Sequence, residues 1–189
     1  MIVPSDHQAI VDELERLGAE ILALAAPMSD EELNRPPVGR PGWSVAQCIE
    51  HLTLTNALYL PALAAAAAKG RAAGRGRRDA LRPNLLGRWL IRELEPPPKR
   101  RVRAPLAEIE PPPRLDREPL LSDFAARQAG MIELIRETSD LDLTGIRFRN
   151  PLAKNLPVFN LAAGFLIVAA HERRHLWQAQ RVGRAAAES

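Results

Sequence analysis

The sequence predicts an all-α protein, a four-helix bundle with an additional short helix and a proline-rich connector. Two observations predict this fold class. Four long segments carry apolar residues at intervals of three and four, the period of a helix that buries one face. The 189 residues are 46% hydrophobic but only 4% aromatic, and they include 17 prolines, which favours helices joined by proline-containing connectors over a sheet. The length suits one domain, so we assign residues 1–189 to a single helical-bundle domain.

The first helix is predicted over residues 5–26. Ser5 and Gln8 have the spacing of a capping box, in which each side chain bonds to the backbone of the other residue. One apolar stripe follows, formed by Ile10, Leu14, Leu17, Ile21 and Leu24. Pro27 is expected to end this helix, and a second capping box at Ser29 predicts a short helical turn.

The second long helix is predicted from Ser44 to about Lys69. Ser44 and Gln47 again have the spacing of a capping box. Pro61 lacks a backbone N–H and clashes with the preceding turn, so we expect it to kink the helix or to end a sub-segment. The glycine- and arginine-rich stretch 70–76 is predicted to be a loop.

Residues 70–118 are predicted to form a basic, proline-rich connector that contains one short helix, from about Asn84 to Leu94. Two runs of three prolines, at 96–98 and 111–113, bracket an extended stretch. We expect this stretch to cross the surface and not to build a second domain.

The basic charge of the chain lies in one segment. Between Lys69 and Arg103, twelve Lys and Arg face three acidic residues, a net charge of +9, which leaves −6 for the rest of a chain whose total is +3. We favour a solvated basic linker. A nucleic-acid-binding patch would need stacking aromatics or a known motif, and Trp89 is the only aromatic residue of the segment, so nucleic acid is not an expected partner.

The third long helix is predicted over residues 118–139. Its expected apolar face consists of Leu121, Phe124, Ala125, Met131, Leu134 and Ile135. Residues 141–157 are predicted to be a loop with two asparagine-containing turns. The last helix is expected to follow Asn160 as its N-cap and to run to about Val182, where Gly183 can terminate it.

No targeting or membrane-spanning segment is expected. The two longest apolar runs, 57–68 and 161–170, are shorter than the run of about 20 residues that spans a bilayer. The first residues lack a basic stretch followed by an apolar one. The one cysteine cannot form an internal disulfide, which favours a reducing compartment. We therefore expect a cytoplasmic protein with no membrane partner.

Three of the four histidines form a candidate metal site. His171 and His175 stand at positions i and i+4 of the last helix, where two imidazoles on one face can bind one divalent ion. His51 lies two turns after the Ser44 cap and is the candidate third ligand; three such ligands leave one position open, as in catalytic zinc sites. The alternative is that these histidines only form hydrogen bonds to neighbouring helices. His7 is expected at the surface.

Residues 171–175 also match His-Glu-x-x-His, in which the glutamate of a zinc metalloprotease acts as general base. Gln178 and Arg181 stand where the extended protease motif has a glycine and a third histidine, and no predicted sheet precedes this helix. An HExxH metalloprotease is therefore a minor alternative. Glu172 lies about 100° around the helix from His171, so we expect it to pair with a basic residue or to lie at the surface.

Helical spacing places further residues near the histidines. The candidates for the pocket or for contact with the ligands are Cys48, Thr55, Arg174 and Gln178. Cys48 can equally be a small buried residue, and Arg174 can bind a substrate anion or form a salt bridge. Trp43 is expected to be a packing anchor. No catalytic residue is assigned.

Two stretches resemble the motifs of one family. Residues 43–52, Trp-Ser-Val-Ala-Gln-Cys-Ile-Glu-His-Leu, are similar to the Trp-Ser…His-Leu signature of the DinB-like (DinB/YfiT) superfamily. Residues 165–178 resemble the last-helix motif of that family, and Asn150-Pro151 and the order of the helices also fit. The resemblance implies a four-helix bundle, a homodimer and a divalent metal ion, zinc or nickel, held by three histidines. Carried over to this chain, these ligands are His51, His171 and His175.

The resemblance also implies a function. Characterised relatives include thiol S-transferases that use bacillithiol or glutathione and an isomerase that depends on mycothiol, and others are regarded as metal-dependent hydrolases. We therefore expect a small-molecule metalloenzyme, a thiol S-transferase or a hydrolase, with a low-molecular-weight thiol as cosubstrate in the first case. The alternative is a non-catalytic, metal-stabilised binding scaffold.

Overall fold

The structure is a computed structural model, and it describes residues 6–37, 39, 41–77, 81–98, 106–152 and 159–187. Its elements, in chain order, are α1 (His7–Ala25), α2 (Asp30–Asn34), α3 (Val45–Ala72), α4 (Leu85–Leu94), the 3₁₀ turn η1 (Ala107–Ile109), α5 (Arg117–Glu137), β1 (Arg147–Phe148), β2 (Phe159–Asn160) and α6 (Leu161–Ala187). Helices dominate and each strand has two residues, so the predicted all-α class is confirmed for the described part of the chain.

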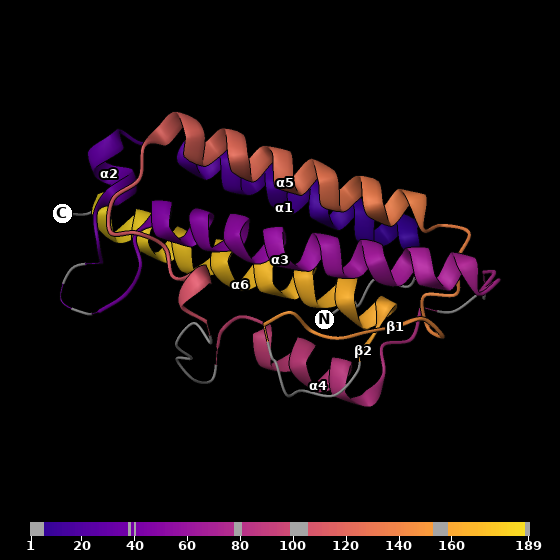
Figure 1. Ribbon diagram of the computed structural model, residues 1–189. Helices are drawn as coiled ribbons and strands as arrows, with labels where there is room; N and C mark the ends of the chain where they lie inside the picture. The colour runs from indigo at the N-terminus through magenta and orange to yellow at the C-terminus, as the bar shows by residue number, and fades with distance from the viewer. Residues whose placement is uncertain are drawn as a thin grey trace.

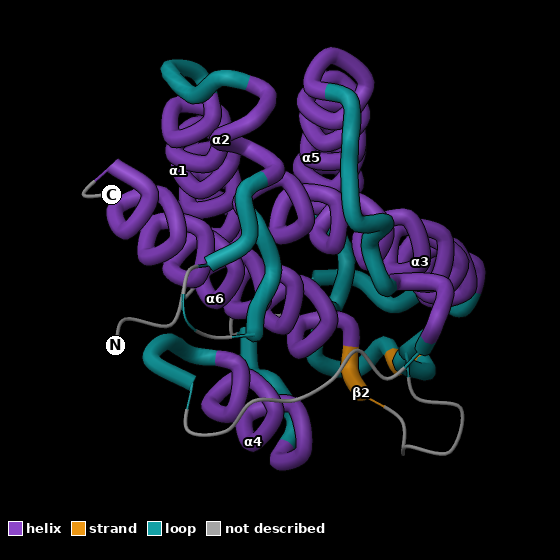
Figure 2. Tube along the Cα trace, turned by 90° about the vertical axis from the view of Figure 1, so that its left-hand side faces the viewer, coloured by secondary structure: helices purple, strands orange, loops and turns teal. Residues whose placement is uncertain are grey.

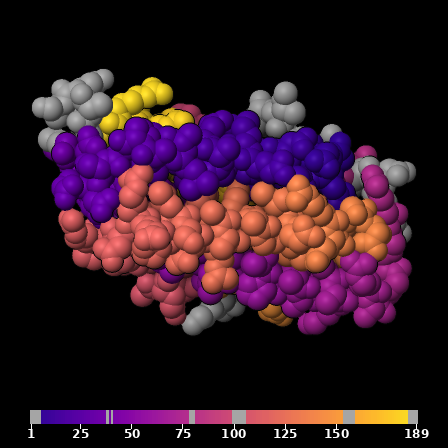
Figure 3. All heavy atoms as spheres, turned by 90° about the horizontal axis from the view of Figure 1, so that it is seen from above, coloured from indigo at the N-terminus to yellow at the C-terminus, as the bar shows by residue number. Residues whose placement is uncertain are grey.

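Four long helices, α1, α3, α5 and α6, lie side by side along the molecule (Figure 1). α3 packs against α5 and α6, and α1 packs against the same two helices. α1 and α3 are therefore diagonal to each other, as are α5 and α6. Figure 3 shows α5 lying between α1 and α3 on one face. The colour gradient in Figure 1 shows that α3 and α5 run in one direction and α1 and α6 in the other.

Because α3 and α5 are parallel, the chain between them must return along the molecule. α4 lies on this return path and packs against α6 (Figure 2), and η1 packs against α3. Arg173 on α6 fastens the segment after α4, since its guanidinium forms ion pairs with Glu95 and with Glu13 of α1. The predicted connector is thus attached to the long helices, although residues 78–80 and 99–105 lie outside the described residues.

Two of the predicted capping boxes are confirmed. The Ser29 and Ser44 hydroxyls accept hydrogen bonds from the backbone N–H of Glu32 and Gln47, and the side chains of Glu32 and Gln47 accept from the two serine N–H groups. Both boxes satisfy backbone donors that a helix start would otherwise leave unpaired. The box at Ser44 fixes the beginning of α3, the helix that carries His51.

The start of α1 differs from the prediction. Asp6 is the N-cap, and its carboxylate accepts a hydrogen bond of 2.9 Å from the backbone N–H of Ala9. The Gln8 side chain donates to Asp12. Ser5 lies outside the described residues. The prediction that Ser5 is the N-cap is therefore wrong, because Asp6, one residue later, caps this helix.

Pro61 does not end α3, which runs without interruption to Ala72. Pro61 is exposed, whereas Tyr59 and Leu63 on either side of it are buried in the core. Burial of both flanking turns stabilises the helical backbone across the missing N–H, because tertiary packing supplies most of the stability of a helix in a protein.

The predicted loop at 70–76 begins later, at Ala73. Gly70 is still helical and buried. A Cβ at this position would lie 2.3 Å from Cδ1 of Ile146, so the glycine allows the chain after α5 to approach α3 closely. The close approach of Ile146, and not a turn, therefore explains why residue 70 is a glycine.

α5 occupies the predicted segment, but one residue of its predicted apolar face is wrong. Ala125 is exposed, whereas Phe124 and Met131 are buried as expected. Gln128 is also buried, with 5% of its surface exposed. A polar side chain thus occupies the centre of the face that α5 turns toward the other helices.

α6 begins as predicted and ends later. The Asn160 side chain accepts a hydrogen bond of 3.1 Å from the backbone N–H of Ala163, which is the expected N-cap interaction. Gly183 does not terminate the helix, which continues to Ala187. A Cβ at Gly183 would lie 2.7 Å from Cε of Met28, so this glycine makes room for a side chain from the loop after α1.

The predicted loop 141–157 contributes one short pairing. β1 and β2 are antiparallel, with Arg147 opposite Asn160 and Phe148 opposite Phe159. Residues 153–158 lie outside the described part of the chain. The pairing places the residues just before α6 beside the middle of the α5–α6 connection.

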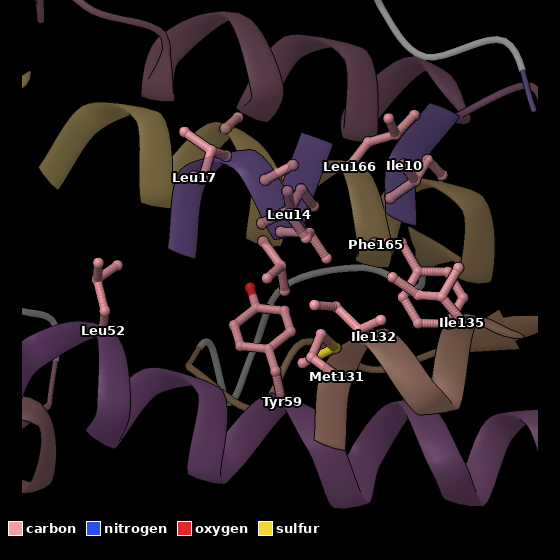
Figure 4. Packing of buried hydrophobic residues seen from close by; sticks show 14 of the residues in the cluster. Ile10, Leu14, Leu17, Leu52, Tyr59, Met131, Ile132, Ile135, Phe165 and Leu166 are labelled. Carbon is pink, nitrogen blue, oxygen red and sulfur yellow. The ribbon is translucent and has the colours of Figure 1, made fainter. Parts of the chain in front are cut away.

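The core lies between the four long helices. Figure 4 shows Leu14 of α1 pointing toward Tyr59 of α3 and Met131 of α5, while Leu166 of α6 lies beside Ile10 of α1 in the same core cluster. Every residue from 161 to 170 of α6 is buried, so α6 is the most deeply enclosed of the four over this stretch. Within the described residues, no helix combines the length and the apolar character that crossing a membrane requires.

Candidate metal centre

Three histidines from two antiparallel helices meet beside the core. His51 lies in the second turn of α3, and His171 and His175 are one turn apart on α6. The ring centroids are 5.0 Å apart for His51 and His171, 4.6 Å for His51 and His175, and 4.5 Å for His171 and His175. One nitrogen from each ring can be chosen so that all three lie within 4.8 Å of one another. The structure thus brings together the three residues selected from the sequence.

The His51 ring is held by the connector. Its Nδ1 atom lies 2.7 Å from the carbonyl oxygen of Ile109, in η1. A carbonyl only accepts, so Nδ1 carries the proton and Nε2 keeps its lone pair. That Nε2 lies 3.2 Å from Nε2 of His171, which must therefore be the donor between the two rings. A backbone carbonyl of this kind is a frequent support of a metal-binding histidine.

The environment keeps the three imidazoles neutral. Burial lowers the pKa of His51, and the hydrogen bond to Ile109 partly opposes this shift. The pKa values of His171 and His175 lie well below the ordinary value of 6.5, first because both rings are buried and then because of the neighbouring histidines and Arg174. Neutral imidazoles have the free lone pair that a metal ligand needs.

The residues fit a divalent ion. Nδ1 of His175 is buried and has no hydrogen-bond partner among the described residues. Two nitrogens bound to one tetrahedral zinc at about 2.0–2.1 Å would lie about 3.3 Å apart, close to the separation of the His51 and His171 nitrogens. An orphaned nitrogen in a buried cluster of lone pairs is expected where an ion completes the site.

Trp43 covers the site from the residue before the Ser44 cap. Its ring lies 4.6 Å from that of His51 and 5.7 Å from that of His175, stacked on the latter. The indole is half-buried. Trp43 therefore contacts two of the three candidate ligands, a closer relation to the site than the packing anchor that the sequence suggested.

Arg174 lies on the same turn of α6 as the histidines. One of its nitrogens, Nη1, donates to the carbonyl oxygen of Glu93 at the end of α4, 3.1 Å away. Its charge contributes to the low pKa of all three histidines, so it lies close to the candidate site. Burial lowers the pKa of Arg174 itself.

The other sequence candidates occupy the following positions. Cys48 is buried in the core, and burial raises the pKa of its thiol, so the sulfur is not a thiolate. The Thr55 hydroxyl is buried and donates to the carbonyl oxygens of His51 and Leu52. Gln178 is half-buried. Participation of these three in a pocket stays a prediction.

The expectation for Glu172 is wrong. This side chain is fully buried and not at the surface, and its hydrogen bonds within the described part of the chain go to amides and not to a basic residue. Its Oε1 accepts from Nδ2 of Asn56 at 3.1 Å, and its Oε2 accepts from Nε2 of Gln128 at 2.8 Å. The turn of α6 points Glu172 between the long helices while His171 faces α3. A carboxylate bound by two amides in the core is not available as a general base, which counts against the metalloprotease alternative.

Sequence reasoning missed Asn56 and Gln128. One signal was present for Gln128, since it interrupts the apolar face of α5 between Phe124 and Met131. The remaining histidine, His7, is half-buried and not fully at the surface. Its Nε2 lies 3.0 Å from the carbonyl oxygen of Thr138, which accepts its proton.

Comparison with known sequences identifies the family. Comparisons with curated proteins and with solved structures give no match. The family model of the DinB superfamily matches residues 13–179, a range that contains the three histidines, Trp43 and the buried Glu172. The match covers most of the 189 residues and all four long helices in whole or large part. The chain therefore belongs to the DinB superfamily.

Proposed function

We propose that the protein is a small-molecule metalloenzyme that binds one divalent ion, zinc or nickel, through His51, His171 and His175. The observation that carries this proposal is the convergence of three neutral imidazoles whose ligand atoms lie within 4.8 Å of one another. All three come from secondary structure, which holds ligands more rigidly than loops do. We also propose that the four long helices form the four-helix bundle of the family and that the protein is a homodimer.

Three protein ligands leave room for a further ligand, which is the arrangement of catalytic rather than structural zinc sites. A divalent ion bound there would supply Lewis acidity, which lowers the pKa of a water or thiol that binds beside the histidines. His51 is oriented for this by the carbonyl oxygen of Ile109. Trp43 shields two of the rings from solvent on one side.

Arg174 adds a positive charge beside the three neutral rings. A site that combines a divalent ion with a guanidinium favours an anionic ligand, such as a thiolate or the carboxylate of a small thiol. Such a ligand fits the thiol S-transferase, and the hydrolase is the second candidate reaction. A non-catalytic, metal-stabilised scaffold is the alternative, and turnover decides between them.

Metal content tests the site. The protein, purified without a histidine tag and exposed to Zn²⁺ or Ni²⁺, is expected to hold about one ion per chain, the stoichiometry of a three-histidine centre. His51→Ala and His171→Ala are expected to lose the ion. His7→Ala is the matched control, because His7 is a histidine outside the cluster. Full occupancy in both site variants would remove the assignment.

A thiol panel tests the reaction. The metal-loaded protein is incubated with a generic electrophile, either alone or with glutathione, bacillithiol or mycothiol, and both consumption of the electrophile and thioether formation are measured by mass spectrometry. The transferase predicts turnover that depends on one thiol and disappears in His171→Ala. Equal turnover without any thiol would identify a hydrolase instead, and no turnover with any substrate would favour the scaffold.

A further inference from the structure

All four long helices meet at one buried polar cluster, formed by Asn56 of α3, Gln128 of α5 and Glu172 of α6. Glu172 is 0% exposed, Asn56 2% and Gln128 5%. Glu172 accepts one hydrogen bond from each amide, and Nε2 of Gln128 also donates to the carbonyl oxygen of Leu14 on α1, 2.8 Å away. We call these three side chains the Glu172 cluster. It joins α5 to α6, which are diagonal to each other.

Stability alone does not explain this cluster. A carboxyl group in an apolar core loses hydration, and its hydrogen bonds offset that loss only in part. Apolar side chains of similar volume often stabilise such a position as well or better. Where buried polar groups are retained, their best-attested effect is to fix one alignment of the helices by leaving polar atoms unpaired in every other alignment.

The apolar packing around the cluster fixes the alignment of α3 and α6 only weakly. α6 is apolar and buried at every position from 161 to 170, and α3 contains five successive alanines, Ala64–Ala68. Leu63 of α3 packs closely against Gly164 of α6 at one point. Elsewhere small and uniformly apolar surfaces interlock weakly, so a slide of one helical turn, about 5.4 Å, would still bury much apolar area. That slide would leave Glu172 without its two amide donors.

The cluster lies directly beside the histidines. Glu172 follows His171 in the chain, and Asn56 is five residues after His51, an axial distance of about 7.5 Å. Because α3 and α6 are antiparallel, the bond from Asn56 to Glu172 sets which residues of α6 stand opposite His51.

We infer that Glu172 is a positioning residue: through Asn56 and Gln128 it fixes the register of α6 against α3, and thereby holds His171 and His175 opposite His51. The expected effect of the Glu172 cluster on metal affinity rests on the proposed function. Its expected effect on the register of α6 against α3 does not rest on that function.

The first test replaces the cluster with apolar residues of similar volume, in the triple variant Asn56→Leu, Gln128→Leu, Glu172→Met. It is expected to keep its helix content and its melting temperature, but to bind Zn²⁺ at least about tenfold more weakly, the size of effect typical when the support of metal ligands is lost. Titration of the folded, metal-free protein measures this. Zn²⁺ affinity within twofold of the original chain would overturn the inference.

Two further variants separate positioning from stability. Leu63→Ala removes a fully buried side chain elsewhere on α3, so it is expected to lower the melting temperature and to leave Zn²⁺ affinity unchanged. Glu172→Gln can accept from Gln128 and, if the Asn56 amide turns over, donate to Asn56, so it is expected to retain Zn²⁺ affinity. Affinity that simply followed melting temperature across all variants would assign the cluster a structural role only.

A measurement without metal tests the register itself. Spin labels are attached at Ala65→Cys on α3 and Arg184→Cys on α6, both exposed positions, with Cys48→Ala removing the native thiol. One narrow distance is expected with the cluster intact, and a broadened distribution or one shifted by about 5 Å, a helical turn, in the triple variant. An unchanged narrow distance would overturn the inference. If the original chain binds no metal, the proposed function fails, and these distances still decide the register.

Discussion

The Nδ1 atom of His51 lies 2.7 Å from the carbonyl oxygen of Ile109, 58 residues further along the chain. The contact joins the second turn of α3 to the connector between α4 and α5. It determines which nitrogen of His51 bears the proton, and so which one faces the other histidines. A segment that the sequence suggested would only cross the surface thus takes part in the candidate metal centre.

The tautomers of the histidines follow from this contact. In the metal-free protein His51 is expected to be protonated at Nδ1, and His171 at Nε2, because the two Nε2 atoms share one proton across 3.2 Å. Zn²⁺ is expected to move the His171 proton to Nδ1. Nitrogen-15 spectra of the imidazoles measure both states, and a His51 ring protonated at Nε2 would contradict the contact.

Removing the anchor of η1 is expected to weaken metal binding. The Ile109 side chain is 1% exposed, and its burial holds η1 in place. Ile109→Gly removes this side chain, so the carbonyl that orients His51 is expected to become mobile. Zn²⁺ affinity is expected to fall about tenfold, as for other losses of a ligand's hydrogen-bond partner. Glu108→Ala, an exposed position in the same turn, is the control and is expected to bind normally.

Trp43 is expected to report on the site by fluorescence. Its ring lies 4.6 Å from that of His51 and 5.7 Å from that of His175, so a paramagnetic ion such as Ni²⁺ or Co²⁺ bound to these rings quenches its emission. Trp43→Phe is expected to lose most of the quench, while Trp89→Phe on α4 retains it. Equal quenching in both variants would place the ion elsewhere.

Glu172 is expected to make stability depend on pH. Burial raises its pKa to about 7 from 4.5, against the hydrogen bonds from Gln128 and Asn56, which lower it. The folded state then binds the proton more tightly than the unfolded state, so the contribution of Glu172 is most favourable below about pH 4.5 and is lost as the pH rises toward 7.

Comparison with Glu172→Gln tests this contribution, because the variant keeps all three histidines and lacks only the titrating carboxyl group. Between pH 5 and pH 8 the free energy of unfolding of the original chain is expected to fall by about 2 to 3 kcal/mol relative to the variant. Urea unfolding with a metal chelator measures it. The same difference at both pH values would show that Glu172 does not change protonation in this range.

Two glycines are expected to respond oppositely to alanine. A Cβ at Gly164 of α6 would lie 2.5 Å from Cδ2 of Leu63 and 2.8 Å from Cε1 of Phe148, so Gly164→Ala is expected to destabilise the protein by about 1–3 kcal/mol. A Cβ at Gly130 of α5 would meet only Cδ2 of Leu60, at 3.2 Å. Gly130→Ala is therefore expected to stabilise by up to about 1 kcal/mol through helix propensity. Urea unfolding that ranked the two variants in the reverse order would contradict the packing of α3 against α6.

Much of the fold was predictable because it depends on neighbours in the chain. Ser29 and Ser44 start helices through side chains three residues away, and Asn160 does the same for α6. The pairing of His171 with His175 follows from the helical repeat alone. These interactions are local, so the sequence determines them without knowledge of the fold.

Only the tertiary structure decided the rest, because it depends on groups that are distant in the chain. Gly70 and Gly183 remain helical since Ile146 and Met28 pack where a Cβ would stand. Glu172 is buried because two amides from other helices reach it, and the angle around one helix could not reveal them. The sequence by itself determined which histidines are available and which helices carry them. The packing of α3, α5 and α6 determined that these histidines meet, and that a backbone carbonyl from the connector orients the first of them.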